Sequence, residues 1–99
     1  MLVSGKARDL LLEHVEFLSQ VSIKASSDLL DLFEEKVTSL ETMPLRCAYY
    51  DNPYIPKGKY RKLALGKHLL ILLQVYEETV LIELVIDARS GATRLKGLD

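Results

Sequence analysis

Cysteine and long apolar runs are scarce in this chain, and each scarcity excludes a class of protein. The single cysteine, Cys47, rules out an intramolecular disulfide and a thiolate metal cluster, which favours a reducing compartment. The longest apolar run covers residues 69–73, far short of the roughly 20 residues that a membrane-spanning helix needs. The N-terminus lacks the apolar core of a secretory signal. We therefore expect a cytoplasmic protein without a membrane partner.

Acidic side chains are absent between Asp51 and Glu77, although the chain has 14 acidic and 13 basic residues. Residues 1–51 carry five basic and nine acidic side chains, whereas residues 52–99 carry eight and five. A polyanion would therefore be bound by the second half, through salt-sensitive phosphate contacts. The acid-free segment contains five cations: Lys57, Lys59, Arg61, Lys62 and Lys67.

The chain of 99 residues is 48% hydrophobic and 27% charged, which fits a single domain over residues 1–99. Apolar residues at three- and four-residue spacing predict two helices. The first begins after Ser4 and runs to about Gln20, and the second begins after Ser22 and ends before Pro44. The short connection predicts an antiparallel helix hairpin. A loop over residues 43–59 should follow, and loops of this length are usually functional or held to the domain body.

Beyond the loop the apolar period changes to two, which predicts strands at residues 60–65, 69–76 and 79–87 in an antiparallel meander. Alternation in the last strand places four apolar side chains on one face, expected to pack on the helices: Val80, Ile82, Leu84 and Ile86. The middle strand is apolar on both faces. Its second face should be covered by the C-terminal tail, by a partner chain or by both. These elements predict the α+β class.

Short motifs stand in a characteristic order along nearly the whole chain. They are V-S-G-K-A-R-D-L at 3–10, F-E-E-K-V at 33–37, P-L-R at 44–46, N-P-Y-I-P-x-G-K-Y-R-K-L at 52–63, G-K-H-L-L-I-L-L-Q-V at 66–75 and V-x-D-A-R at 85–89. In these motifs the chain resembles the RelE/ParE superfamily of toxins from bacterial type II toxin–antitoxin (plasmid stabilization) modules. The resemblance implies an N-terminal antiparallel helix hairpin packed on a three- to four-stranded antiparallel sheet.

The same resemblance implies a toxin that a cognate antitoxin holds inactive. Two activities share the family fold, and fold alone does not choose between them. The first is ribosome-dependent cleavage of mRNA by a metal-independent endoribonuclease (mRNA interferase), without a cofactor. The second is inhibition of DNA gyrase without nuclease activity, and a non-toxic relative that only binds antitoxin is a third alternative. The first hypothesis is the mRNA interferase, with the ribosome and mRNA as partners.

The chain departs from the family pattern at the strand after Gly66. RNA-cleaving members often begin this strand with Tyr-Arg, whereas Leu69 and Leu70 stand here. The tyrosine near the C-terminus of those members is also missing, with Leu95 close to its place. Both departures favour the alternatives without RNA cleavage.

RNA cleavage by the 2′-hydroxyl needs a proton acceptor, a cation for the charge on phosphorus and a proton donor for the leaving oxygen. Arg61 and Arg89 could clamp a phosphate through two hydrogen bonds each, although both could instead support the fold or bind antitoxin. His68 could transfer protons near neutral pH, although turn histidines are usually only solvated. The candidate catalytic residues are Lys59, Arg61, Lys62, His68 and Arg89.

Candidate binding residues surround this set. Tyrosines beside cations could stack on unpaired bases or could hold the loop to the domain. The candidate RNA-binding residues are Tyr54, Lys57, Lys59, Lys62 and Lys67, and the candidate antitoxin-binding residues are Leu70 and Leu72.

His14 falls on the apolar stripe of the first helix and is interpreted as a packing residue. The histidines and Cys47 lie in three elements without ligand spacing, so no metal site is expected.

Overall fold

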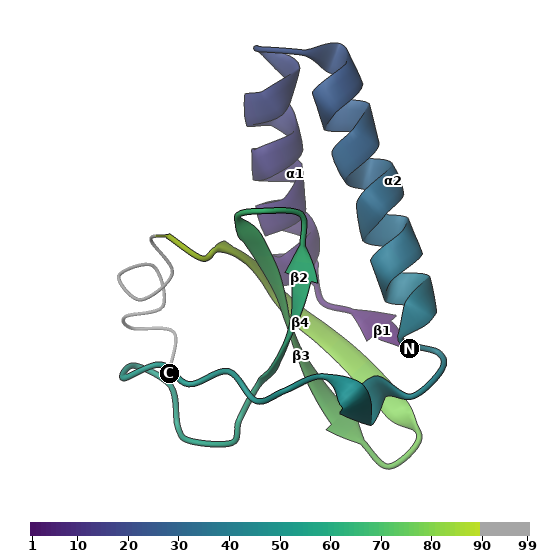
Figure 1. Cartoon of the computed structure of the whole chain (residues 1–99), viewed down its shortest axis with the longest axis vertical. Coiled ribbons are helices and arrows are strands. Elements are labelled where there is room, and N and C mark those ends of the chain that lie inside the picture. The colour runs from purple at the N-terminus through teal and green to yellow at the C-terminus, as the bar shows by residue number, and fades with distance from the viewer. Residues whose placement is uncertain (90–99) are drawn as a thin grey trace.

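The computed structural model describes residues 1–89, in which a helix hairpin is followed by a sheet (Figure 1). Helix α1 spans Gly5–Ser19 and helix α2 spans Ile23–Ser39. Each begins at a serine whose Oγ accepts a backbone N–H from the first turn, Ser4 from Ala7 at 2.9 Å and Ser22 from Ala25 at 3.1 Å. Both predicted helices and both caps are confirmed.

The sheet contains four strands in the order β1-β4-β3-β2. Their bounds are Leu2–Val3 for β1, Arg61–Leu65 for β2, Leu69–Tyr76 for β3 and Thr79–Asp87 for β4. The meander β2-β3-β4 is antiparallel, as predicted. Strand β1 pairs parallel with β4, so the sheet is mixed and the expectation of a wholly antiparallel sheet is wrong. Parallel strands need a long connection, and the chain between β1 and β4 passes through both helices, the loop, β2 and β3.

Gly66 opens the turn between β2 and β3 and adopts a φ of +75°, in the left-handed region that favours glycine. A Cβ at this position would lie 3.7 Å from the Cδ2 of Leu32, so the turn also packs closely on α2. The sequence Gly66-Lys67-His68 therefore fixes the hairpin and places its two polar residues beside the helices.

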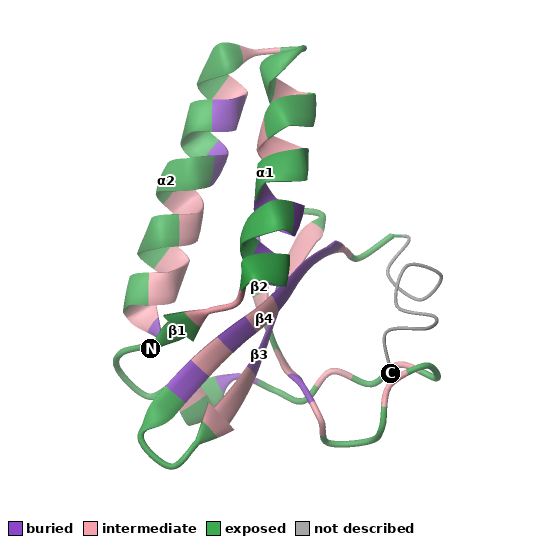
Figure 2. Ribbon diagram, turned by 180° about the vertical axis from the view of Figure 1, so that it is seen from behind, coloured by how far each residue is buried: buried purple, intermediate pink, exposed green. Residues whose placement is uncertain are grey.

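The helices lie on one face of the sheet, and the chain between α2 and β2 crosses the other (Figures 1 and 2). Buried residues concentrate along β3 and β4, whereas the outer surfaces of both helices are exposed (Figure 2). The largest fully buried side chains are Leu40, Leu65, Ile71, Leu72, Leu73, Ile82, Val85 and Ile86. In the part of the chain that the structure describes, no helix combines the length and apolar character needed to cross a membrane.

A β-bulge in β4 changes which residues face the helices. Leu72 pairs with Leu84 and Leu73 pairs with Ile82, so Glu83 stands between two consecutive pairs without a partner. An extra residue on one strand interrupts the alternation of faces. The prediction of a single apolar face in β4 is therefore wrong. Val80, Ile82 and Val85 share the helix side of the sheet, whereas Leu84 and Ile86 lie on the opposite face with their partners in β3.

The loop after α2 covers much of that opposite face. It contains a short 3-10 helix, η1, at Pro44–Arg46. The guanidinium of Arg46 donates to the carbonyl of Ser39, the last residue of α2, and to the carbonyls of Thr42 and Met43 just beyond it, which ties η1 to the end of the helix. Buried or half-buried loop side chains join the main core: Cys47, Tyr50, Ile55 and Tyr60. The expected contribution of the C-terminal tail lies outside the described residues.

The loop also shields the free edge of β2. Tyr49 forms an antiparallel bridge with Arg61, and the N–H of Lys62 donates to the carbonyl of Ala48 at 2.9 Å. An unpaired strand edge can add strands from other molecules, and a paired edge cannot. The loop was predicted to be functional or held to the domain body. These backbone contacts hold it along the edge of the sheet.

Candidate functional site

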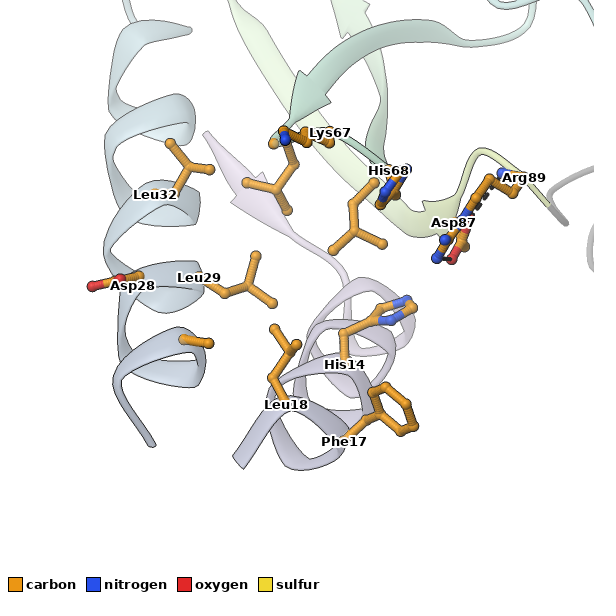
Figure 3. Close-up of a pocket in the computed structure, with 14 residues that line it drawn as sticks. His14, Phe17, Leu18, Asp28, Leu29, Leu32, Lys67, His68, Asp87 and Arg89 are labelled. Atoms are coloured by element: carbon orange, nitrogen blue, oxygen red, sulfur yellow. Dashed lines mark hydrogen bonds and ion pairs between the residues drawn. The ribbon is translucent and has the colours of Figure 1, made fainter. Parts of the chain in front are cut away.

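An open groove of about 350 Å³ lies between the two helices and the β2–β3 hairpin. Its sides are mainly apolar, formed by Leu18 of α1, Leu29 and Leu32 of α2, and Leu65 and Leu69 of the hairpin. Figure 3 shows Lys67 and His68 at one end and Phe17 and Leu18 at the other. The groove therefore has a polar end at the hairpin turn and an apolar end near the tip of the helices.

Sheet pairing assembles the polar end. Leu69 pairs with Asp87, and just beyond this pair the N–H of Ala88 donates to the carbonyl of His68 at 2.7 Å. This bond brings the turn after β2 against the residues that follow β4. His68 and Arg89, 21 positions apart in the chain, consequently line the same groove. Of the predicted catalytic residues, these two are brought together.

Arg89 is paired with Asp87 across the polar end. Its Nη2 lies 2.8 Å from Asp87 Oδ2, its Nε donates to Oδ1 at 3.1 Å, and its backbone N–H donates to Oδ1 at 2.8 Å. These hydrogen bonds hold the pKa of Asp87 well below its ordinary range, and the positive charge of His14 lowers it further. The carboxylate in turn raises the pKa of Arg89. The guanidinium thus already presents two donors in the geometry that a phosphate would need.

Arg61 is held by the loop rather than directed into the groove. Its Nη1 donates to the carbonyl of Cys47 at 2.7 Å, and its Nη2 donates to the hydroxyl of Tyr49 at 3.1 Å. The guanidinium also lies 4.2 Å from the centroid of the Tyr49 ring. These contacts match the interpretation of Arg61 as a support of the fold.

The lysines of β2 and the preceding loop lie away from the polar end. Lys62 stands three positions before Leu65, roughly 10 Å along the strand from the turn. It is exposed and shares a face with its partner Leu72, opposite the helices. Lys59 lies over the ring of Tyr60, 5.3 Å from its centroid. The predicted catalytic set is therefore divided, with Lys59, Arg61 and Lys62 in one region and His68 and Arg89 in another.

The candidate RNA-binding residues are also divided. Lys57 and Tyr54 are exposed in the loop, where the N–H of Tyr54 donates to Asn52 Oδ1 at 2.8 Å. Lys67 is exposed at the polar end of the groove. Exposure leaves all three side chains accessible to a phosphate or a base.

The candidate antitoxin contacts have unequal exposure. Leu72 has 0% of its surface exposed, as do its neighbours Ile71 and Leu73, whereas Leu70 is half-buried. An apolar strand with an uncovered face would expose an apolar patch to a partner, but these three residues expose none, because the loop and the helices cover both faces of β3 here. Large exposed apolar side chains occur instead around the tip of the helix hairpin: Phe17, Val21 and Ile23.

Cys47 is buried, and burial raises the pKa of its thiol. The positive charges of Arg46 and Arg61 lower the pKa but do not reverse this effect. Among residues 1–89, no group of three or more histidine, cysteine or acidic side chains is placed to hold a metal ion.

Asp87 and His14 were missed as site residues. Asp87 belongs to the motif V-x-D-A-R, but the sequence does not say that its carboxylate turns back on Arg89. His14 was interpreted as packing because it falls on the apolar stripe of α1; it is half-buried and lines the groove with Asp87 (Figure 3). The i, i+2 spacing of Asp87 and Arg89 at a strand end was the available signal for the ion pair.

Comparison of the chain with models of known protein families and with curated proteins gave no match.

Proposed function

We propose that this chain is a RelE/ParE-like toxin of a type II toxin–antitoxin module, a cytoplasmic mRNA interferase neutralised by a cognate antitoxin. The ordered motifs along residues 3–89 support the family, and the α+β fold with its N-terminal helix hairpin is the one that the resemblance implies. The acid-free, cationic segment before Glu77 supports an anionic target.

One observation supports cleavage more than any other: the hydrogen bond between Ala88 and His68 brings a histidine and an arginine to one end of the groove. His68 takes the proton of the attacking 2′-hydroxyl, whose oxygen bonds to phosphorus while the bond from phosphorus to the 5′-oxygen breaks. A water molecule at the open groove protonates the leaving 5′-oxygen. Arg89 exchanges the oxygens of Asp87 for two oxygens of the scissile phosphate, because carboxylate and phosphate accept the same bidentate pair of donors. Lys67 adds positive charge to the same end and stabilises the charge that develops on phosphorus.

The remaining cations bind the RNA away from the cleaved bond. Lys57, Lys59 and Lys62 lie on or near the first strand of the meander, and each can contact a phosphate without sequence preference. Tyr54 stacks on an unpaired base. Arg61 positions this surface through the loop and does not touch the scissile phosphate.

Primer extension on mRNA from cells that express the chain tests this proposal. Induction should stop growth and produce new mRNA ends that depend on translation, and a co-expressed antitoxin should remove both effects. Arrested growth without new mRNA ends would exclude the interferase. A control variant is Lys6→Ala on the exposed surface of α1, outside the groove lining, which should arrest growth and cleave mRNA as the wild type does.

Gyrase inhibition is the second candidate, and two observations favour it. Leu69 and Leu70 occupy the positions where cleaving relatives place Tyr-Arg, and the guanidinium of Arg89 is engaged by Asp87. A DNA supercoiling assay with purified chain tests it. Inhibition at micromolar protein together with intact mRNA would favour this candidate, and unaffected gyrase would exclude it. Harmless overexpression would indicate a relative that only binds antitoxin.

A further inference from the structure

The groove between the helices and the β2–β3 hairpin has opposite characters at its two ends (Figure 3). Its walls are leucines from both helices and the hairpin, and its apolar end is lined by Phe17, Leu18 and Ala25. Phe17 is 66% exposed although it is a large aromatic side chain. An apolar groove with a few polar groups gathered at one end is the usual form of a small-molecule site.

Positive charge predominates at the polar end. Lys67 is exposed and makes no ion pair within residues 1–89. Arg89 offsets the charge of Asp87, the acidic residue at this end of the lining, and holds it by three hydrogen bonds, so the charge of Lys67 is left in excess. His68 lies at the same end, and His14 lies between this end and Phe17 (Figure 3). The remaining acid of the lining, Asp28, sits on α2 in an ion pair with Lys24 at 3.0 Å. The polar end is therefore complementary to an anion.

The apolar part is long enough for an extended chain. The residues of α2 that line the groove run from Ala25 to Leu32, roughly 10 Å along the helix axis at 1.5 Å per residue. The volume of about 350 Å³ lies at the lower end of the range for ligand pockets, about 300–1,000 Å³. These dimensions fit one unbranched chain better than a bulky ring system or a peptide helix.

We propose that this groove binds a single-chain amphipathic carboxylate of the medium-chain fatty acid class. The carboxylate lies at the end formed by Lys67, His68 and Arg89, and the alkyl chain follows α2 toward Phe17. Leu18, Leu29 and Leu32 remove the chain from water. The site shares Lys67, His68 and Arg89 with the proposed cleavage site, but its test does not depend on RNA cleavage, because binding is measured on the isolated chain without ribosome or RNA.

Isothermal titration of the purified chain with hexanoate, octanoate, decanoate and dodecanoate, below their micelle concentrations, tests this inference. The dissociation constant should fall about fourfold for each added methylene until the groove is full. The alcohols of the same length should bind at least about tenfold more weakly, because they carry no charge for Lys67 and Arg89. Equal affinity of acid and alcohol, or no dependence on chain length, would overturn the proposal.

Two pairs of variants locate the site. Lys67→Glu should weaken decanoate binding about tenfold, whereas Lys6→Glu on the exposed surface of α1 should leave it unchanged. Ala25→Leu should fill the apolar end and abolish the gain from octanoate to decanoate, whereas Ser27→Leu on exposed α2 should retain it. Equal effects within either pair would contradict the assigned site.

Analytical ultracentrifugation tests whether a second copy of the chain occupies the groove instead. A dimer that the Phe17→Ser change dissociates would show this, and it would also overturn the proposal.

Discussion

The guanidinium of Arg61 stacks on the ring of Tyr49 at 4.2 Å and donates to its hydroxyl, while a second nitrogen donates to the carbonyl of Cys47. One side chain thereby joins β2 to the loop that covers the sheet. The contacts explain why a loop of this length is ordered along the sheet edge, because it gains hydrogen bonds and a stacked ring.

Removing this side chain should destabilise the fold. We expect Arg61→Ala to lower the free energy of unfolding by about 1–3 kcal/mol, from the lost charged hydrogen bonds and the stacking on Tyr49. Lys62→Ala, at the exposed neighbouring position, should change it by no more than about 0.5 kcal/mol. Urea unfolding of both variants measures this. A stable Arg61→Ala that has lost only RNA cleavage would instead assign Arg61 to catalysis.

Ser4 and Ser22 form a matched pair of helix caps. Ser4 Oγ also donates to the carbonyl of Glu83 at 2.8 Å, which joins the start of α1 to the bulge in β4. We therefore expect Ser4→Ala to cost about 2 kcal/mol, from the cap and the additional hydrogen bond, and Ser22→Ala about 1 kcal/mol. Thermal or urea unfolding compares them. Equal losses would show that the bond to Glu83 contributes nothing measurable.

Leu72 and Leu70 differ in burial, and this difference separates a core role from a partner-binding role. Leu72→Ala should cost about 2–5 kcal/mol because the side chain is fully buried, and Leu70→Ala should cost below about 2 kcal/mol. Unfolding curves measure both values. A Leu72→Ala variant as stable as the wild type would contradict the observed packing.

The Asp87–Arg89 pair predicts a dependence on pH. Arg89 lowers the folded-state pKa of Asp87 below the unfolded value of about 3.9, so the pair contributes stability above that pH and loses it as pH falls through the folded pKa. In Arg89→Gln, nuclear magnetic resonance of the Asp87 carboxyl should give a higher titration midpoint. Lys67→Gln, a nearby change without contact to Asp87, should not raise it comparably. An unchanged midpoint in Arg89→Gln would contradict the pairing.

Much of the fold follows from local patterns. Serine caps, three- and four-residue apolar spacing and the switch to alternation at residue 60 predicted both helices and the three meander strands. The bulge at Glu83 was not predictable, because an extra residue on one strand depends on its partner and leaves no pattern of its own. The parallel pairing of β1 was missed for a similar reason, since two residues carry too little signal to show a partner.

The site was less predictable than the fold. Charge and residue type identified His68 and Arg89, but alternation could not show that Arg61 turns to the loop or that His14 lines the same groove as Asp87. Both outcomes depend on contacts between elements far apart in the sequence. Sheet geometry also separates the predicted catalytic residues into two regions. Lys62 lies in β2 roughly 10 Å from the β2–β3 turn, where His68 lies.

The most direct test of the proposed function compares mRNA cleavage by the wild-type chain and by His68→Gln on translating ribosomes. The wild type should produce new mRNA ends. His68→Gln should fold normally and cleave about 10²–10⁴-fold more slowly, as expected for the loss of a general base. Equal cleavage rates would contradict the role of His68, and a wild-type chain that arrests growth without cleaving mRNA would contradict the interferase itself.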